Sequence, residues 1–82
     1  MDESRSQILK ALGVLIKQRR IQLKLSQEEL GFRANLDRTY ISGLERGTRN
    51  PSLTTLVTLA CGLGISVSEL LDSLENQASN IE

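Results

Sequence analysis

The sequence predicts an all-α fold, a compact domain of five helices. Apolar residues recur with helical spacing along the chain, and no stretch alternates apolar and polar residues as a half-buried strand would. Leucine dominates the apolar residues and proline occurs once, a composition that favours helices. Serine or aspartate stands directly before several apolar runs, where it marks helix starts. A chain of 82 residues is long enough for one domain, residues 1–82.

The first predicted helix runs from about Ser6 to Leu23. The second starts after Ser26 and ends near Arg33. Ser26 and Glu29 form a capping box, in which the serine oxygen accepts a backbone N–H three residues on and the glutamate reaches back.

The third predicted helix starts after Asp37 and ends near Arg46, where Gly47 can take the left-handed conformation that ends many helices. The fourth starts after Ser52 and ends near Leu63.

The fifth predicted helix starts at a second capping box, formed by Ser66 and Glu69, and ends near Leu74. The tail, residues 75–82, is polar, and we expect it to fray.

Charge divides the chain into two unlike parts. Residues 5–50 hold ten Lys or Arg against four Asp or Glu, a balance of +6, whereas residues 51–82 hold four acids and no base. One basic side and one acidic side suit a protein that turns one face toward DNA. Scattered surface charge is the alternative reading.

The composition argues against several other classes of protein. A lone Cys61, expected to be buried, excludes a disulfide framework and a cysteine-based zinc site. Histidine is absent, so the commonest metal ligand and general base are missing, and we expect no metal, cofactor, small-molecule ligand or enzymatic activity. No apolar run approaches the roughly 20 residues that span a bilayer, and the N-terminus shows no signal-peptide pattern. We therefore expect a cytoplasmic protein without a membrane partner.

Two short helices joined by a tight turn, at about residues 27–46, carry a family resemblance. With the preceding residues 19–26, this stretch resembles the helix-turn-helix of Cro and phage-repressor proteins, and the similarity extends over about residues 9–74. Within that family, one run most resembles the controller proteins of restriction–modification systems: Leu36-Asp37-Arg38-Thr39-Tyr40-Ile41-Ser42-Gly43-Leu44-Glu45-Arg46.

Two positions depart from the family pattern. Lys24 stands where the family usually has glycine, so either this lysine is left-handed or the turn differs. Asn35 replaces the turn glycine, and asparagine tolerates positive φ better than other non-glycine residues.

The resemblance implies a role for each residue of the third helix and its surroundings. In this architecture the first turn of that helix enters the major groove, so Arg38 and Thr39 would read bases, with Ser42 and Gly43 one turn further along. Candidate contacts to the DNA backbone or an adjacent groove are Gln27, Tyr40, Arg46, Arg49, Asn50, Arg33 and Arg19. Arg20 and Glu45 would form a partly buried structural ion pair.

A second subunit is expected on the C-terminal half. Residues 63–74 hold an apolar stripe, part of which must close the monomer core while the rest faces a second copy. The candidate interface residues are Leu63, Ile65, Val67, Leu70, Leu71 and Leu74. The alternative is that the whole stripe is internal.

These features predict a sequence-specific transcriptional regulator that binds a palindromic, double-stranded operator as a homodimer. Resemblance to controller proteins implies activation and repression at its own promoter and that of a neighbouring endonuclease gene, with RNA polymerase as a further candidate partner. The alternative is a protein-interaction module on the same fold, an antitoxin or a coactivator. Arg38 and Thr39 on the groove-facing turn favour the regulator.

Overall fold

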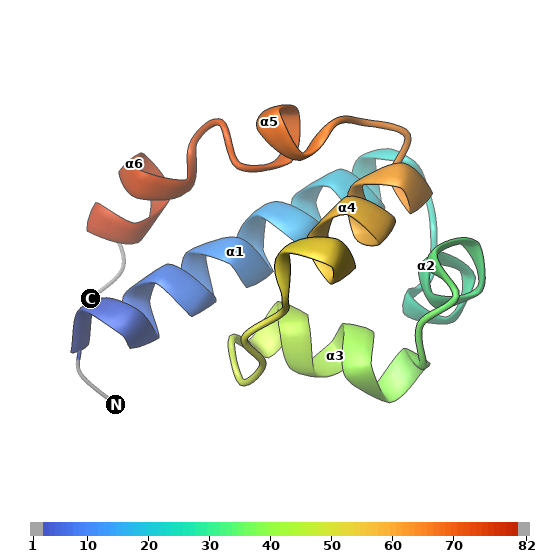
Figure 1. The fold of residues 1–82 in the computed structure, drawn as a ribbon, viewed down its shortest axis with the longest axis horizontal. Coiled ribbons are helices and arrows are strands. Elements are labelled where there is room, and N and C mark those ends of the chain that lie inside the picture. Colours follow the sequence, from blue (N-terminus) through green and yellow to red (C-terminus); the bar gives the residue numbers. More distant parts are fainter. Residues whose placement is uncertain (1–2, 81–82) are drawn as a thin grey trace.

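A computed structural model describes residues 3–80, and the two residues at each end of the predicted domain lie outside this described part. Within it every regular element is an α-helix (Figure 1). The helices are α1 (Glu3–Gln22), α2 (Gln27–Ala34), α3 (Arg38–Arg46), α4 (Leu53–Gly62), α5 (Val67–Leu70) and α6 (Leu74–Ser79). The all-α prediction is confirmed, and the five predicted helices are present, the last of them interrupted.

The long helix α1 organises the molecule. It packs against α3 on one side and against α6 on the other, and α4 contacts both α2 and α5 (Figure 1). One apolar cluster fills the space between them. Its fully buried larger side chains are Ile16, Leu30, Ile41, Leu44, Leu59 and Leu63.

Side-chain caps start the helices where the sequence predicts. Ser26 Oγ accepts the Glu29 N–H at 3.0 Å, and Glu29 Oε1 accepts the Ser26 N–H at 2.8 Å, which completes the first capping box. Ser66 and Glu69 form the second box at 3.0 and 3.2 Å. Asp37 caps α3 through the Thr39 N–H at 2.7 Å. Local sequence therefore determines where α2, α3 and α5 begin.

The ends of the first three helices turn through left-handed residues. Gly47 follows α3 with φ of 78°, and Asn35 follows α2 with φ of 54°. Lys24, after α1, has φ of 59°, so of the two readings of this position the left-handed one is correct. A lysine in this region is strained, because its Cβ approaches the following carbonyl oxygen.

The fifth predicted helix differs most from expectation. It stops after one turn at Leu70, and the chain resumes as α6. The break returns the chain along α1, so that Leu71 and Leu74 both pack on the core (Figure 1). The tail was expected to fray, but its described residues are helical as far as Ser79, and residues 81–82 lie outside the described part.

No single helix in the described part is long and apolar enough to cross a membrane, although the bent pair Leu53–Gly62 and Val67–Ser79 passes a test of length and composition.

Candidate nucleic-acid interface

Helix α3 presents a polar face to solvent. Arg38, Thr39 and Arg46 are exposed and Ser42 is half-buried, whereas Ile41 and Leu44 on the opposite side are buried. Arg46 Nη1 donates to Ser42 Oγ one turn back along this face. Arg49 and Asn50, in the loop that follows, are also exposed. The structure thus brings together six of the predicted contact residues, on one helix and its adjoining loop.

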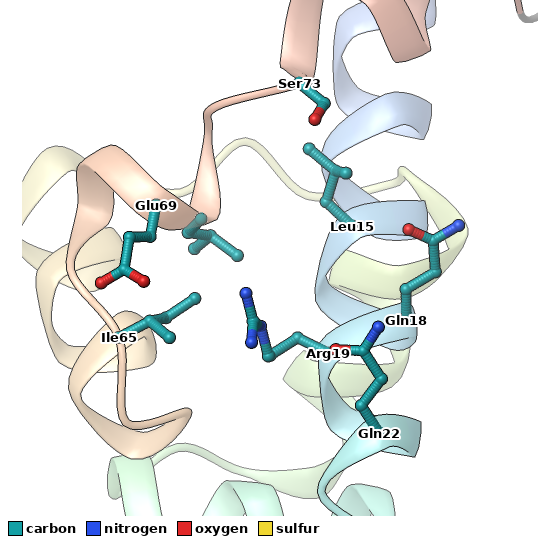
Figure 2. A pocket seen from close by; sticks show the side chains of 8 residues that line it. Leu15, Gln18, Arg19, Gln22, Ile65, Glu69 and Ser73 are labelled. Atoms are coloured by element: carbon teal, nitrogen blue, oxygen red, sulfur yellow. The ribbon is translucent and has the colours of Figure 1, made fainter.

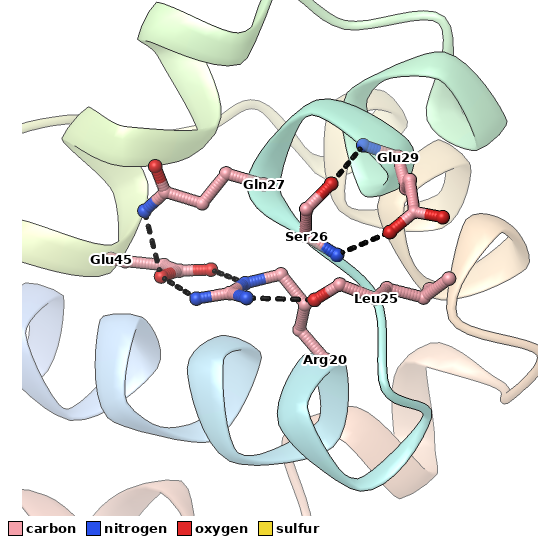
Figure 3. A network of polar contacts seen from close by, with 6 residues as sticks. All are labelled: Arg20, Leu25, Ser26, Gln27, Glu29 and Glu45. Atoms are coloured by element: carbon pink, nitrogen blue, oxygen red, sulfur yellow. Dashed lines mark hydrogen bonds and ion pairs between the residues drawn. The ribbon is translucent and has the colours of Figure 1, made fainter.

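A polar network fixes the orientation of α3 relative to α1 and α2 (Figure 3). Arg20 Nε and Nη2 donate to the two carboxylate oxygens of Glu45 at 2.7 and 2.9 Å, and Arg20 Nη1 donates to the Leu25 carbonyl at 2.8 Å. The side chains of Arg20 and Glu45 are 12% and 4% exposed. Hydrogen bonding to Glu45 raises the pKa of Arg20. This bidentate pair is the structural ion pair that the family resemblance implies.

Gln27 joins the same network. Its Nε2 donates to Glu45 Oε1 at 3.0 Å, so the first residue of α2 is tied to the last turn of α3 (Figure 3). The side chain is half-buried. Of the predicted backbone-contact residues, Gln27 is therefore also a structural bridge between the two helices of the motif.

Gly13 was not singled out from the sequence, yet it sets how closely α1 and α3 approach. A Cβ at Gly13 would lie 2.5 Å from the carbonyl oxygens of both Leu44 and Glu45. Only glycine allows the two backbones to come this near. A glycine inside a predicted helix was the available signal.

Gly43 was predicted to read bases, but it does not lie on the exposed face of α3. The residue is buried, and a Cβ there would lie 2.9 Å from the Arg49 side chain. Thr48 Oγ1 donates to the Gly43 carbonyl at 3.1 Å, so the glycine lets the following loop fold back on α3. Arg49 also lies over the half-buried Tyr40 ring, 5.6 Å from its centroid.

Arg33 turns away from the exposed face of α3. Its Nη1 donates to the Gly62 carbonyl at 3.4 Å, at the C-terminal end of α4, where a positive charge is favourable.

Arg19 also lies elsewhere than predicted. It lines a pocket between α1 and α5 with Ile65, Glu69 and other residues (Figure 2). Helix α5, which contributes Glu69 and Leu70 to the lining of that pocket, lies on the side of α1 opposite α3 (Figure 1). Helical spacing alone does not reveal which side of α1 faces which neighbour.

The predicted dimer stripe is mostly internal. Leu63 and Leu70 are 1% and 4% exposed, so both belong to the monomer core and are corrected as interface residues. The other four are partly buried and pack against the same core: Ile65, Val67, Leu71 and Leu74. Cys61, expected to be buried, is exposed on α4.

Exposed charges of opposite sign lie around α3 and around α5. The exposed Arg38, Arg46 and Arg49 belong to α3 and its loop, whereas the exposed Glu69 and Asp72 belong to α5 and the turn after it. These elements lie on opposite sides of α1 (Figure 1). A polyanion would meet a favourable potential at α3 and an unfavourable one at α5.

Comparisons with known proteins agree with this geometry. A family model described as "Helix-turn-helix" matches residues 16–70. Control protein C.MunI of Mycoplasma sp. is 44% identical over 63 residues, which cover 77% of this chain and 85% of that protein. Control protein C.BamHI of Bacillus amyloliquefaciens is 48% identical over 59 residues, covering 68% and 73% respectively.

Solved structures show the same similarity in three dimensions. The restriction–modification controller protein C.AhdI from Aeromonas hydrophila has a TM-score of 0.72 and 43% identity, over 77% of this chain and 94% of that one. The controller protein C.Esp1396I, solved as a tetramer with its 35-base-pair operator, has a TM-score of 0.80 and 34% identity, over 89% of this chain and 96% of that one.

Proposed function

This chain belongs to the helix-turn-helix family of transcriptional regulators, and its relatives include restriction–modification controller proteins; we propose that it controls a restriction–modification operon by inserting α3 into the major groove of its operator. The observation that carries the proposal is the polar face of α3, where Arg38, Thr39 and Ser42 lie beside Arg46 on a helix held by the Arg20–Glu45 pair.

Each residue of this face has a chemical role in the proposal. The Arg38 guanidinium donates two hydrogen bonds to guanine O6 and N7, and Thr39 offers a methyl group to thymine or a hydroxyl to a phosphate. Arg46, Arg49 and Asn50 contact the sugar–phosphate backbone and set the register of α3 in the groove. Gln27 contacts a phosphate with its second amide hydrogen, since its first is donated to Glu45.

A salt titration tests the proposal. Fluorescence anisotropy with operator and random duplexes should show a steep loss of affinity as salt rises. Arg46 and Arg49 of two subunits would neutralise about four phosphates, which corresponds to a slope of about −4 in a plot of log K against log salt concentration. A slope near zero, or equal affinity for the two duplexes, would rule out a sequence-specific regulator.

The regulator acts as a homodimer on a palindromic operator in this proposal. One recognition helix reads only a few base pairs, and two copies related by a two-fold axis double that number with their α3 helices about 34 Å apart. Sedimentation equilibrium, together with binding to full and half operators, tests this step. A chain that stays monomeric at high micromolar concentration and binds both duplexes equally would contradict it.

Activation requires RNA polymerase as a further partner, and α2 offers a surface for it. Phe32 is 88% exposed and lies beside Glu28 and Glu29, next to the first turn of α3. Carboxylates are repelled by DNA phosphates, so this surface suits a protein that approaches along the DNA. Such a protein works where the DNA is, in the bacterial cytoplasm.

In-vitro transcription separates this contact from operator binding. Phe32→Ala should keep its operator affinity and lose most of the activation. Equal activation by the variant and the wild type would remove Phe32 from the polymerase contact, while leaving the DNA-binding proposal intact.

A further inference from the structure

The pocket between α1 and α5 takes no part in the proposed DNA contact. It lies where the second half of α1 passes the short helix α5, and side chains from both helices line it (Figure 2). Its volume is about 160 Å³. A protein cavity of about 150 Å³ holds a molecule the size of benzene, so this pocket can take the body of a small metabolite.

The lining of the pocket is apolar on the inside and polar at the edge. Leu70 is buried and Leu15 and Ile65 are half-buried, and these three side chains form what we call the apolar floor. Gln22 of α1 and Ser73, just before α6, are exposed at the edge. An apolar surface with a few polar groups that fix the orientation of a ligand is typical of small-molecule sites.

Arg19 brings a positive charge into this pocket. Its guanidinium points from α1 toward α5 (Figure 2), and the residue is half-buried. Within residues 3–80 it makes no hydrogen bond or ion pair, whereas the neighbouring Arg20 is bonded to Glu45 and to the Leu25 carbonyl. A guanidinium presents two parallel N–H donors that match a carboxylate. An unpaired, half-buried arginine therefore favours a ligand that carries a carboxylate.

Glu69 brings a negative charge to the opposite wall. Its Oε1 accepts hydrogen bonds from the N–H and the Oγ of Ser66, at 3.2 and 3.3 Å, and in the described part of the chain its Oε2 accepts none. A carboxylate at this place repels phosphates and dicarboxylates and attracts an ammonium group. The two walls together match a ligand that carries one charge of each sign.

We propose that this pocket binds a free α-amino acid with a short aliphatic side chain, such as leucine. The α-carboxylate accepts two hydrogen bonds from Arg19, the α-ammonium donates to Glu69 Oε2, and the side chain packs on the apolar floor. A pocket of this size excludes the larger indole of tryptophan. Helix α5 lies on the side of α1 opposite α3, so the amino acid and DNA occupy different faces (Figure 1). The inference therefore does not depend on the proposed function.

The first test compares ligands that differ in one group. A titration of the full chain followed by amide chemical shifts should give L-leucine a Kd below about 1 mM. Leucinamide lacks the carboxylate and 4-methylpentanoate lacks the ammonium group, so each should bind at least about tenfold more weakly through the loss of charged hydrogen bonds. No binding of leucine at about 10 mM, or equal affinity for the three compounds, would overturn the proposal.

The second test changes the two charged walls. Arg19→Gln and Glu69→Gln should each weaken leucine binding at least about tenfold. Glutamine also serves in a capping box, so Glu69→Gln keeps the start of α5. Lys17→Gln removes an exposed positive charge of α1 outside the pocket and should bind leucine like the wild type. Leucine binding that survives both pocket variants would overturn the assignment. Operator binding is measured without leucine and tests the proposed function alone.

Discussion

Helices α3 and α4 follow one another along the chain and have similar lengths, nine and ten residues. They expose different kinds of residue to solvent. The inner faces of both are apolar and join the same core. The outer face of α3 carries Arg38, Thr39 and Arg46, whereas that of α4 carries Leu53 and Val57. The inner faces determine the fold, and the difference between the outer faces indicates what each helix meets outside the monomer.

The two helices are also held differently. Glu45, in the last turn of α3, is anchored by a bidentate ion pair with Arg20, while α4 is held by apolar packing and by one longer hydrogen bond, from Arg33 to the Gly62 carbonyl. Directional bonds fix the rotation of a helix, as a helix that must present particular atoms to a ligand requires. Apolar packing is less directional, so it defines the rotation of α4 less tightly.

The largest expected effect comes from removing the support of α3. Glu45→Ala should lower the free energy of unfolding by about 3 kcal/mol, because Arg20 is then left partly buried without its partner. Urea denaturation measures this change, and operator affinity should fall with it. Glu28→Ala, which removes an exposed carboxylate of α2, is the control and should change stability by less than about 0.5 kcal/mol. A small effect at Glu45 would mean that packing alone orients α3.

The next effect sharpens the difference between the two sides of α1. Arg38→Ala should weaken operator binding by about 1–3 kcal/mol while sparing random DNA. Arg19→Ala removes the same charge from the side of α1 that faces α5 and should change operator affinity less than about twofold, since charges beyond a Debye length are screened. Anisotropy titrations compare the two variants. Equal losses would show that only total charge matters.

A smaller effect concerns the strained turn before α2. Lys24→Gly should stabilise the fold by about 1 kcal/mol, since glycine takes the left-handed conformation without the Cβ clash. For a chain of this size that corresponds to a rise in Tm of about 4–8 °C. Thermal unfolding followed by circular dichroism measures it. No rise would indicate that Lys24 makes a compensating contact.

The smallest effect concerns pH, which should affect the caps of α2 and α3 but not the cap of α4. Hydrogen bonds from Ser26 lower the pKa of Glu29, and those from Thr39 lower the pKa of Asp37. A lowered folded-state pKa means that each carboxylate stabilises the fold above its unfolded pKa of about 4, and that this stabilisation is lost as pH falls through the folded-state value. Ser52, which caps α4, does not titrate in this range.

Amide chemical shifts recorded from about pH 6 to about pH 2.5 test this difference. The first-turn amides of α2 and α3 should move with pH, and those of α4 should stay in place. The Glu29→Gln variant should lose the change in α2 alone. Equal movement in all three helices would indicate global acid unfolding.

The sequence predicted the fold well where local chemistry decides it. The capping boxes at Ser26 and Ser66 bond backbone groups only three residues away, and Gly47 needs only its own left-handed φ. The local sequence is therefore enough to predict these helix ends. The exposed residues of α3 were found through the family resemblance, because their exposure depends on which side packs inward.

Tertiary placement was harder to predict. The spacing of Leu63 and Leu70 fits a core and an interface equally well, and only the packed structure assigns them to the core. The exposure of Leu53 and Val57 on α4 could not be predicted, because a helix apolar on two faces shows no clear periodicity. Arg33 reaches the Gly62 carbonyl, 29 positions along the chain, and no local pattern encodes a contact of that range.

The close approach of α1 and α3 at Gly13 has a consequence for mutants of this protein. A single methyl group there would press on the carbonyl oxygens of Leu44 and Glu45, and backbone atoms cannot swing aside as a side chain can. Overpacking of this kind costs about 1–3 kcal/mol, and each kcal/mol lowers the Tm of a domain of this size by about 4–8 °C. Gly13→Ala should therefore yield a heat-sensitive allele, functional in cells grown cool and inactive in warmed ones, with the exposed residues of α3 unchanged.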